Sequence, residues 1–398
     1  MGDRIPARRP PPQRRRSLSW SSPRVRAWVY QTVAVVVLLA AVALLVDNTL
    51  QNMRARGIQS GFDFLLQPAG FDIGEGWLRY ESIDPYWKAF LDGLINTLRV
   101  AVIGCVLTSV LGTLIGIGRF SRNALVRGMC YSYVELFRNV PVLLQLLMWY
   151  LLFTEYLPLP ANALTVGDAV FVSKNGLSFP QLVWQTGYWF GVAGLALGIV
   201  AATVYARLAR ARFERTGVAR PVAAVVALLV IAAAWLGLLA GGAPLQFDDP
   251  FRSDLQIEGG SSLSPEYLAV LLGLVLYTAA YVSEVVRAGI ASVARGQHEA
   301  AAALGLPRGR TMRLIVLPQA LRLMIPPLTN QYLNLTKNSS LAVAVGYPDV
   351  VSIANTSLNQ TGRAVECIAV IMLVYLTLSL STSALMNWFN RRAALKER

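Results

Sequence analysis

The sequence is poor in charged residues. Only 15% of its 398 residues are Asp, Glu, Lys or Arg, whereas a soluble domain carries about 25%. Hydrophobic residues make up 55%. A soluble chain of this length would form two or three domains, each of which needs a well-charged surface. The composition therefore excludes an ordinary soluble protein and favours a protein embedded in a membrane.

Cysteine and histidine are scarce as well. The three cysteines, Cys105, Cys130 and Cys367, stand apart in apolar stretches, which argues against a disulfide framework, a zinc site and an iron–sulfur cluster. The single histidine, His298, argues against a multi-histidine metal centre and weakens any assignment of a Ser-His-Asp triad. We therefore expect no catalytic residue, no bound metal and no cofactor in this chain.

Long apolar runs are present instead. A transmembrane helix needs about 20 consecutive, mostly apolar residues. Segments of this kind lie at 27–47, 89–118, 130–154, 188–206, 221–241, 265–286, 324–346 and 367–389. They predict an all-α integral membrane protein with about eight transmembrane helices, and 324–346 is the most polar of the predicted spans.

The basic residues lie mainly on one side of these predicted spans. If the N-terminus is cytoplasmic, most of the 36 Lys and Arg residues fall in cytoplasmic segments, as the positive-inside rule requires. These segments include a basic tail at 1–26, a loop at 287–322 and a second tail at 391–398, whereas 48–88 becomes a periplasmic segment. The net charge of +14 is then explained by topology, and nucleic-acid binding is not expected.

The cytoplasmic loop 287–322 has an informative local pattern. Residues 297–304 are strong helix formers, Gly305 is a typical helix end, and we expect Pro307 to prevent the helix from resuming. A second helical stretch is expected from Thr311. The loop therefore predicts two short helices that lie parallel to the membrane, where a partner outside the bilayer can push on them.

Within this loop, Glu-Ala-Ala is followed after three residues by Gly and after nine more by Ile-x-Leu-Pro. This spacing resembles the EAA loop of the permease subunits of ATP-binding-cassette (ABC) importers. In that family the loop forms a coupling helix that docks on a separate ATPase subunit. The resemblance implies a docking helix with its turn, formed by Glu299, Ala300, Ala301 and Gly305. It also implies a following segment that contains Ile315, Leu317 and Pro318.

Four further motifs, at 96–98, 137–141, 281–290 and 335–341, resemble the polar amino-acid subfamily of these permeases. The resemblance covers 89–157 and 264–390, and implies the five-helix core of a type I ABC importer in these two regions. The chain departs from the usual pattern by one extra N-terminal span at 27–47 and two inserted spans within 188–241. Long permeases with such insertions resemble those of general L-amino-acid importers.

The resemblance also implies partners. The chain contains no Gly-x-x-x-x-Gly-Lys-Ser/Thr loop that would cradle ATP phosphates, so the nucleotide site is expected on a separate ATPase subunit. A periplasmic binding protein is expected to supply the L-amino-acid substrate, and a second permease subunit is expected to complete a homodimer or heterodimer. The implied location is the bacterial inner membrane, in contact with lipid, with both termini in the cytoplasm.

The alternative function is an ion-coupled secondary transporter of a small polar solute. Such a protein would carry carboxylates at the middle of the membrane and an inverted repeat. The acidic residues here cluster near the ends of the predicted spans, and no repeat is visible in the sequence. Both observations favour the importer permease.

A few charged residues lie within the predicted spans, where charge is costly and marks a candidate functional site. Glu135 and Arg138 are three residues apart near the inner end of one span, so they are expected to share a helix face and can pair with each other. The other candidate partners of Arg138 are Glu284 and the cytoplasmic loop. An ion pair that anchors helices and a direct substrate contact both remain open at this point.

Lys337 lies inside a predicted span among several polar residues. Lipid cannot face such a stretch, so it must line a protein interior or a watery path. We predict that Asn330, Asn334, Lys337 and Ser340 face the translocation pathway, with Lys337 meeting a substrate carboxylate. The alternative is a polar contact between helices of the bundle.

Overall fold

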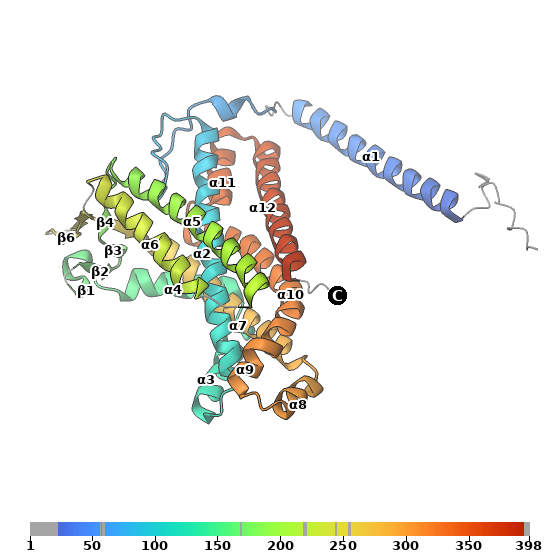
Figure 1. Ribbon diagram of the computed structural model, residues 1–398. Helices are drawn as coiled ribbons and strands as arrows, with labels where there is room; N and C mark the ends of the chain where they lie inside the picture. Colours follow the sequence, from blue (N-terminus) through green and yellow to red (C-terminus); the bar gives the residue numbers. More distant parts are fainter. Residues whose placement is uncertain are drawn as a thin grey trace, which may run out of the picture.

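The computed structural model describes residues 23–393 except 56, 58–59, 168, 218–220, 243–244 and 254–255. Helices dominate this part of the chain, which confirms the all-α class. Residues 1–22 of the predicted N-terminal tail and 394–398 of the C-terminal tail lie outside the described residues. Figure 1 shows the main helices of the bundle, with the N-terminal helix directed away from them at the upper right. These are α2 (Tyr86–Gly118), α7 (Pro265–Ala291), α10 (Leu317–Asn338) and α12 (Ala364–Ala393), and the N-terminal helix is α1 (Pro23–Ala55).

Within the described residues, six helices are long and apolar enough to cross a membrane. They are α1, α2, α7 and α12, together with α5 (Tyr188–Thr216) and α6 (Val222–Ala240). Two bent helix pairs bring the number to eight if each pair forms one span. The predicted number of about eight agrees with this upper value.

The first bent pair covers the predicted span at 130–154 and is sharply bent within it. In the structure α3 (Ala124–Asn139) is followed by α4 (Val142–Leu151) and the π-helical η2 (Leu152–Tyr156) at an angle of 102°. Pro141 lies at the break, and it has no N–H and disfavours helical backbone at Val140, which is extended. The side-chain amide of Gln145 donates to the carbonyls of Phe137 and Val140, over 2.9 Å each, and so satisfies backbone groups at the break.

The second bent pair begins well before the predicted span 324–346. Helical backbone runs without interruption from α9 (Arg308–Thr311) through the π-helical η4 (Met312–Val316) and α10 to the 3-10 helix η5 (Ser339–Val345). The helix α11 (Val350–Thr361) then follows after a bend of 50°. The part of this helix before residue 324 was left out of the predicted span because its arginines lower the hydropathy. Arginine is nevertheless a good helix former, so the helix continues through this part.

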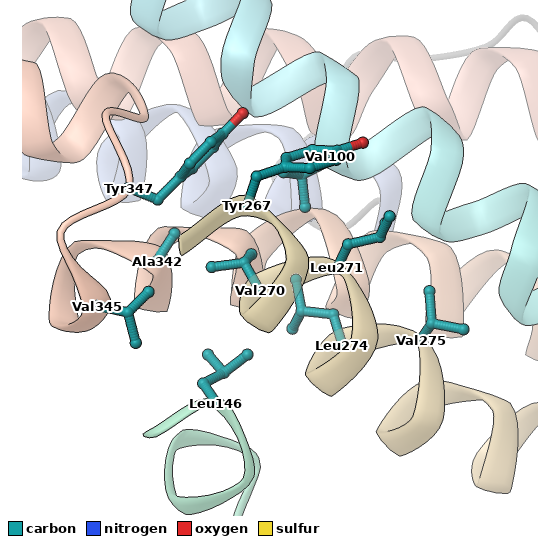
Figure 2. Close-up of a cluster of buried hydrophobic side chains, with 10 residues drawn as sticks. All are labelled: Val100, Leu146, Tyr267, Val270, Leu271, Leu274, Val275, Ala342, Val345 and Tyr347. Carbon is teal, nitrogen blue, oxygen red and sulfur yellow. The ribbon is translucent and has the colours of Figure 1, made fainter. Parts of the chain in front are cut away.

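A buried apolar cluster joins α2, α4, α7 and η5 at the centre of the bundle (Figure 2). Tyr267 of α7 and Tyr347, which follows η5, pack with their ring centroids 5.7 Å apart, and Leu146 reaches the cluster from α4. A small residue lets α2 and α7 approach closely. A Cβ atom added at Gly112 of α2 would lie 2.6 Å from the side chain of Val282 on α7.

The inserted helices α5 and α6 form an antiparallel hairpin that is connected to a small sheet, which the sequence did not predict. Four short strands pair antiparallel in the order β1-β2-β3-β8. Two further pairs, β4-β5 and β6-β7, form separate two-stranded sheets. The strands are β1 (Leu164–Val166), β2 (Val170–Ser173), β3 (Gly176–Phe179), β4 (Gln181–Leu182), β5 (Phe247–Asp248), β6 (Phe251–Arg252), β7 (Ile257–Glu258) and β8 (Ser261–Leu263). A short 3-10 helix, η3 (Pro160–Asn162), precedes them. The β3–β8 pair therefore joins the segments before and after the hairpin.

The segment between α1 and α2 is fastened to α2 and to the start of α12. It contains the 3-10 helix η1 (Asp63–Leu66). Arg363 at the start of α12 donates to Asp63 over 2.5 Å. Further along the segment, Glu75 accepts from Arg99 of α2 over 2.5 Å. The two ion pairs hold this segment over α2 and α12.

Candidate coupling and translocation site

The predicted docking helix is present as α8 (Arg295–Ala303), between α7 and α9. It lies at the same end of the molecule as α3 and α9, the lower end in Figure 1. The N–H of Gly305 donates to the carbonyl of Ala302 over 2.9 Å, and the N–H of Leu306 donates to that of Ala301 over 3.0 Å. This hydrogen-bond pattern, with Gly305 at a φ of 70°, is a Schellman helix end. The turn is thus fixed by a residue that tolerates left-handed backbone.

The expected effect of Pro307 is corrected by the structure. The chain was expected to resume a helix only from Thr311, but α9 begins at Arg308, directly after Pro307. Pro307 adopts extended backbone and occupies the position before the helix, where its missing N–H costs nothing. The coupling loop is therefore two helices joined by a turn of four residues.

The residues implied by the EAA resemblance divide between exposed and buried positions. Ala301 is only 1% exposed and packs toward the bundle, whereas Glu299, Ala300 and Gly305 are exposed. In the segment that follows, Ile315 is half-buried, and Leu317 and Pro318 are exposed. A side-chain hydrogen bond of 3.3 Å between Gln319 and Gln297 links α10 to α8. The exposed face of α8 is thus free to meet another protein.

The charged residues at the end of the bundle near α8 pair differently from the prediction. Glu284 of α7 accepts with one carboxylate oxygen from Arg119 of α2 and with the other from Arg287, one turn along α7. The guanidinium of Arg119 also lies 4.3 Å from the ring centroid of Tyr131 on α3. This cluster connects α2, α3 and α7 close to the start of the coupling loop.

Arg138 pairs neither with Glu135 nor with Glu284 among the ion pairs of the described residues. Both oxygens of Glu284 are already occupied, and the guanidinium of Arg138 lies instead 5.2 Å from the ring centroid of Tyr281. Glu135 accepts a hydrogen bond from the side chain of Asn139 over 3.3 Å. The sequence had no signal for Arg119 as the partner of Glu284, since the two are 165 positions apart.

The predicted pathway residues lie along one side of α10 and η5. Asn330, Asn334 and Lys337 are exposed and follow one another at helical spacing. Lys337 and Ser340 line a cavity of about 350 Å³ together with Val351, Ile371 and Tyr375. The structure therefore brings two of the four residues to one cavity, and places the two asparagines on the same helix face beyond it.

Two polar residues near this cavity were missed by the sequence analysis. The hydroxyl of Tyr375 donates to the carboxylate of Asp349 over 3.5 Å. Asp349 is 1% exposed and caps α11 by accepting from the N–H of Ser352 over 2.8 Å. An aspartate after a proline at the start of a helical pattern is a recognisable N-cap, and could have been found. The approach of Tyr375 depends on the packing of α12.

The described residues thus form a helix bundle with up to eight candidate membrane spans and a short helix exposed at one end. The family described as "Binding-protein-dependent transport system inner membrane component" matches residues 215–395. The chain is 43% identical to the general L-amino acid transport system permease protein AapQ of Rhizobium johnstonii, over 94% of each chain.

Two further relatives are similar over nearly their whole lengths. The permease protein YhdX of Escherichia coli, which its name assigns provisionally to amino-acid ABC transport, is 45% identical over 96% of this chain and 98% of its own. The glutamate/glutamine/aspartate/asparagine transport system permease protein BztB of Rhodobacter capsulatus is 38% identical over 94% and 95%. The chain therefore belongs to the family of binding-protein-dependent ABC importer permeases. It is a multi-pass transport subunit and not itself an enzyme, and this excludes the secondary transporter.

Proposed function

We propose that this chain is a permease subunit of a general L-amino-acid importer in the bacterial inner membrane. The observation that carries the proposal is the 43% identity to AapQ over 94% of both chains, because that relative is named for general L-amino acid transport. The proposed system contains a separate ATPase, a periplasmic binding protein and a second permease subunit. Both termini lie in the cytoplasm, in accord with the positive-inside rule.

The exposed polar side of α10 supports a translocation pathway between two permease subunits. A lysine and two asparagines at membrane depth are too costly to face hydrocarbon. Because Asn330, Asn334 and Lys337 are exposed in the single chain, a water-filled path or a second subunit has to cover them. The alternative for this side of α10 is a polar contact between the two permeases without substrate binding.

Lys337 fits a substrate group that all amino acids share. Its ammonium group provides three hydrogen-bond donors and a positive charge for an α-carboxylate. The cavity beside it, about 350 Å³, also presents the apolar side chains of Val351 and Ile371. A site that binds the common carboxylate and leaves room for varied side chains suits a general transporter.

The continuous helix from Arg308 to Val345 supports a mechanical link between docking and transport. At 1.5 Å per residue it extends for roughly 57 Å, from the coupling turn to the residues that line the cavity. We infer that closure of the ATPase subunits displaces α8 and that the continuous helix from Arg308 to Val345 moves with α8. The cavity would then open to the opposite side of the membrane, which is alternating access.

The role of Lys337 is tested by uptake of labelled amino acids into proteoliposomes that hold the assembled transporter. Lys337→Ala is expected to reduce uptake at least about tenfold, because a charged hydrogen-bond partner of the carboxylate is lost. Lys337→Arg, which keeps the charge, is the matched control and should retain more activity. Unchanged uptake by Lys337→Ala in a fully assembled complex would exclude the substrate contact and favour the subunit-contact alternative.

A further inference from the structure

A hollow lies behind the predicted docking helix, in addition to its exposed face. It has a volume of about 300 Å³ and is enclosed by α8, the turn after it and the start of the long helix. Its lining includes His298 and Ala302 of α8, Leu306 of the turn, Arg308 of α9, and Met312 and Val316 of η4. The lining is mainly apolar, with His298, Arg308 and Thr311 as the polar members.

The turn keeps this hollow open. The two hydrogen bonds of the Schellman helix end fix the direction in which α9 leaves α8. The hydroxyl of Thr311, which also lines the hollow, faces the backbone carbonyls of Leu306 and Pro307 at 3.5 and 3.3 Å. On the opposite wall Ala302 offers only a methyl group. The two helices therefore leave space between them instead of packing against each other.

The surroundings of the hollow are apolar and basic, which is the character of a binding surface. Leu304 beside it is 78% exposed and Met312 in its wall is 39% exposed. Exposed apolar groups of this kind mark interaction sites when they gather at one place. The described segment 295–313 carries four arginines and Glu299 as its one acidic residue. A matching partner surface would present an apolar side chain flanked by carboxylates.

We propose that the ATPase subunit inserts an apolar side chain, flanked by acidic residues, into this hollow. The inference rests on the proposed docking of an ATPase at α8 and adds a second contact to it. In this arrangement the helix α8 enters the partner, and the partner in turn enters the space between α8 and the long helix. The contact with α8 is continuous with the hollow, since His298 and Ala302 belong to the same helix as Glu299.

The inserted side chain would change how force passes through the coupling loop. One wall of the hollow belongs to α8, and another belongs to η4, which continues into α10. A side chain wedged between them prevents the Gly305 turn from bending when α8 is pushed. Movement of α8 is then transmitted to the long helix and to the cavity at Lys337.

A size series at Ala302 tests the insertion. Ala302→Leu fills the hollow and is expected to weaken binding of the purified ATPase to the assembled permeases about tenfold, because insertion into a filled space is overpacking. Ala302→Ser has nearly the original volume and is the matched control, expected to bind like wild type. Leucine is a better helix former than serine, so a loss confined to Ala302→Leu reflects volume and not helix stability.

Thiol protection gives a second measurement that does not depend on a bulky variant. The cysteine of Ala302→Cys is labelled with a maleimide in liposomes, with and without the ATPase, and the labelled peptide is quantified by mass spectrometry. Protection by the ATPase is expected. Equal labelling in both conditions, or protection by lipid before the ATPase is added, would overturn the insertion.

The outcomes separate this inference from the proposed function. If the ATPase binds wild type and Ala302→Leu with equal affinity, the hollow is not occupied, while docking at α8 stands. If both Ala302→Leu and Ala302→Ser lose binding equally, the effect is not one of volume and the insertion is also excluded. If the ATPase fails to bind the wild-type permeases at all, the proposed function itself fails.

Discussion

Substitution of Gly305 tests whether the turn after α8 sets the position of the docking helix. Gly305 has a φ of 70°, and among the described residues no heavy atom lies within 4 Å of the place that a Cβ would take. A side chain therefore meets no steric obstacle there. The whole cost of Gly305→Ala is the left-handed backbone, about 1–2 kcal/mol. Asparagine adopts this backbone several-fold more often than most residues, so Gly305→Asn costs less.

This cost limits the size of the effect. If the strained turn relaxes, the hydrogen bonds of 2.9 and 3.0 Å at the end of α8 are lost, and α8 leaves its docking position in a fraction of the molecules. A cost of 1–2 kcal/mol corresponds to a factor of about five to thirty in this equilibrium. The affinity for the ATPase falls by that factor at most, since only the docking-competent fraction binds.

The assay is the affinity of the purified ATPase subunit for the assembled permeases in nanodiscs. The expected order of affinity is wild type, then Gly305→Asn, then Gly305→Ala. Gly309→Ala is the matched control, because Gly309 lies within α9 and also has free space among the described residues, but not at positive φ. Alanine favours the helix there, so affinity should not fall. Wild-type affinity for Gly305→Ala, or an equal loss for Gly309→Ala, would refute the positioning role of the turn.

Three further predictions concern the stability of the permease in detergent. Glu284→Gln leaves a buried guanidinium of α2 without its carboxylate and is expected to lower the free energy of unfolding by about 1–3 kcal/mol; an unchanged unfolding midpoint would show that the cluster is not structural. Arg363 donates to Asp63 and thereby lowers the pKa of that carboxyl below its usual range. This contact therefore stabilises the segment between α1 and α2 above about pH 4 and is lost as the pH falls further. Proteolysis of the segment between α1 and α2 should rise only below that pH, and Asp63→Asn should reduce the pH dependence, with the remainder due to the Glu75–Arg99 pair; a rise already between pH 7 and 5 would contradict the assignment. Gly112→Ala is expected to cost about 1–3 kcal/mol because its Cβ meets α7, whereas Gly128→Ala, which has free space among the described residues, should cost nothing.

Features that depend on neighbouring residues in the chain could be predicted from the sequence. The apolar runs gave the class and the approximate number of spans, and the helix end at Gly305 followed from the preference of glycine for left-handed backbone. Motif spacing pointed to the permease family before any contact was known. Each of these signals is contained within a few tens of residues.

Features that depend on distant residues could not be predicted. Glu284 pairs with Arg119 from a distant part of the chain, whereas the sequence analysis considered Arg138 as its partner. The strands of the three small sheets have two to four residues, which is too short to show a two-residue period. The kink at Pro141 is a local exception, because the proline is visible in the sequence but hydropathy over a span of about 20 residues averages across it. Tertiary packing determines the ion pair and the sheets, and one proline determines the kink, so local hydropathy predicts none of the three.

ATP-dependent uptake is the most direct test of the proposed function. The chain would be reconstituted in proteoliposomes with its second permease, the ATPase and the binding protein, and uptake of labelled L-amino acids would be measured after ionophores collapse all ion gradients. Uptake that requires ATP and an active ATPase, and that continues without ion gradients, is the predicted result. Uptake that continues with an inactivated ATPase, or that stops when the gradients collapse while ATP is present, would contradict it.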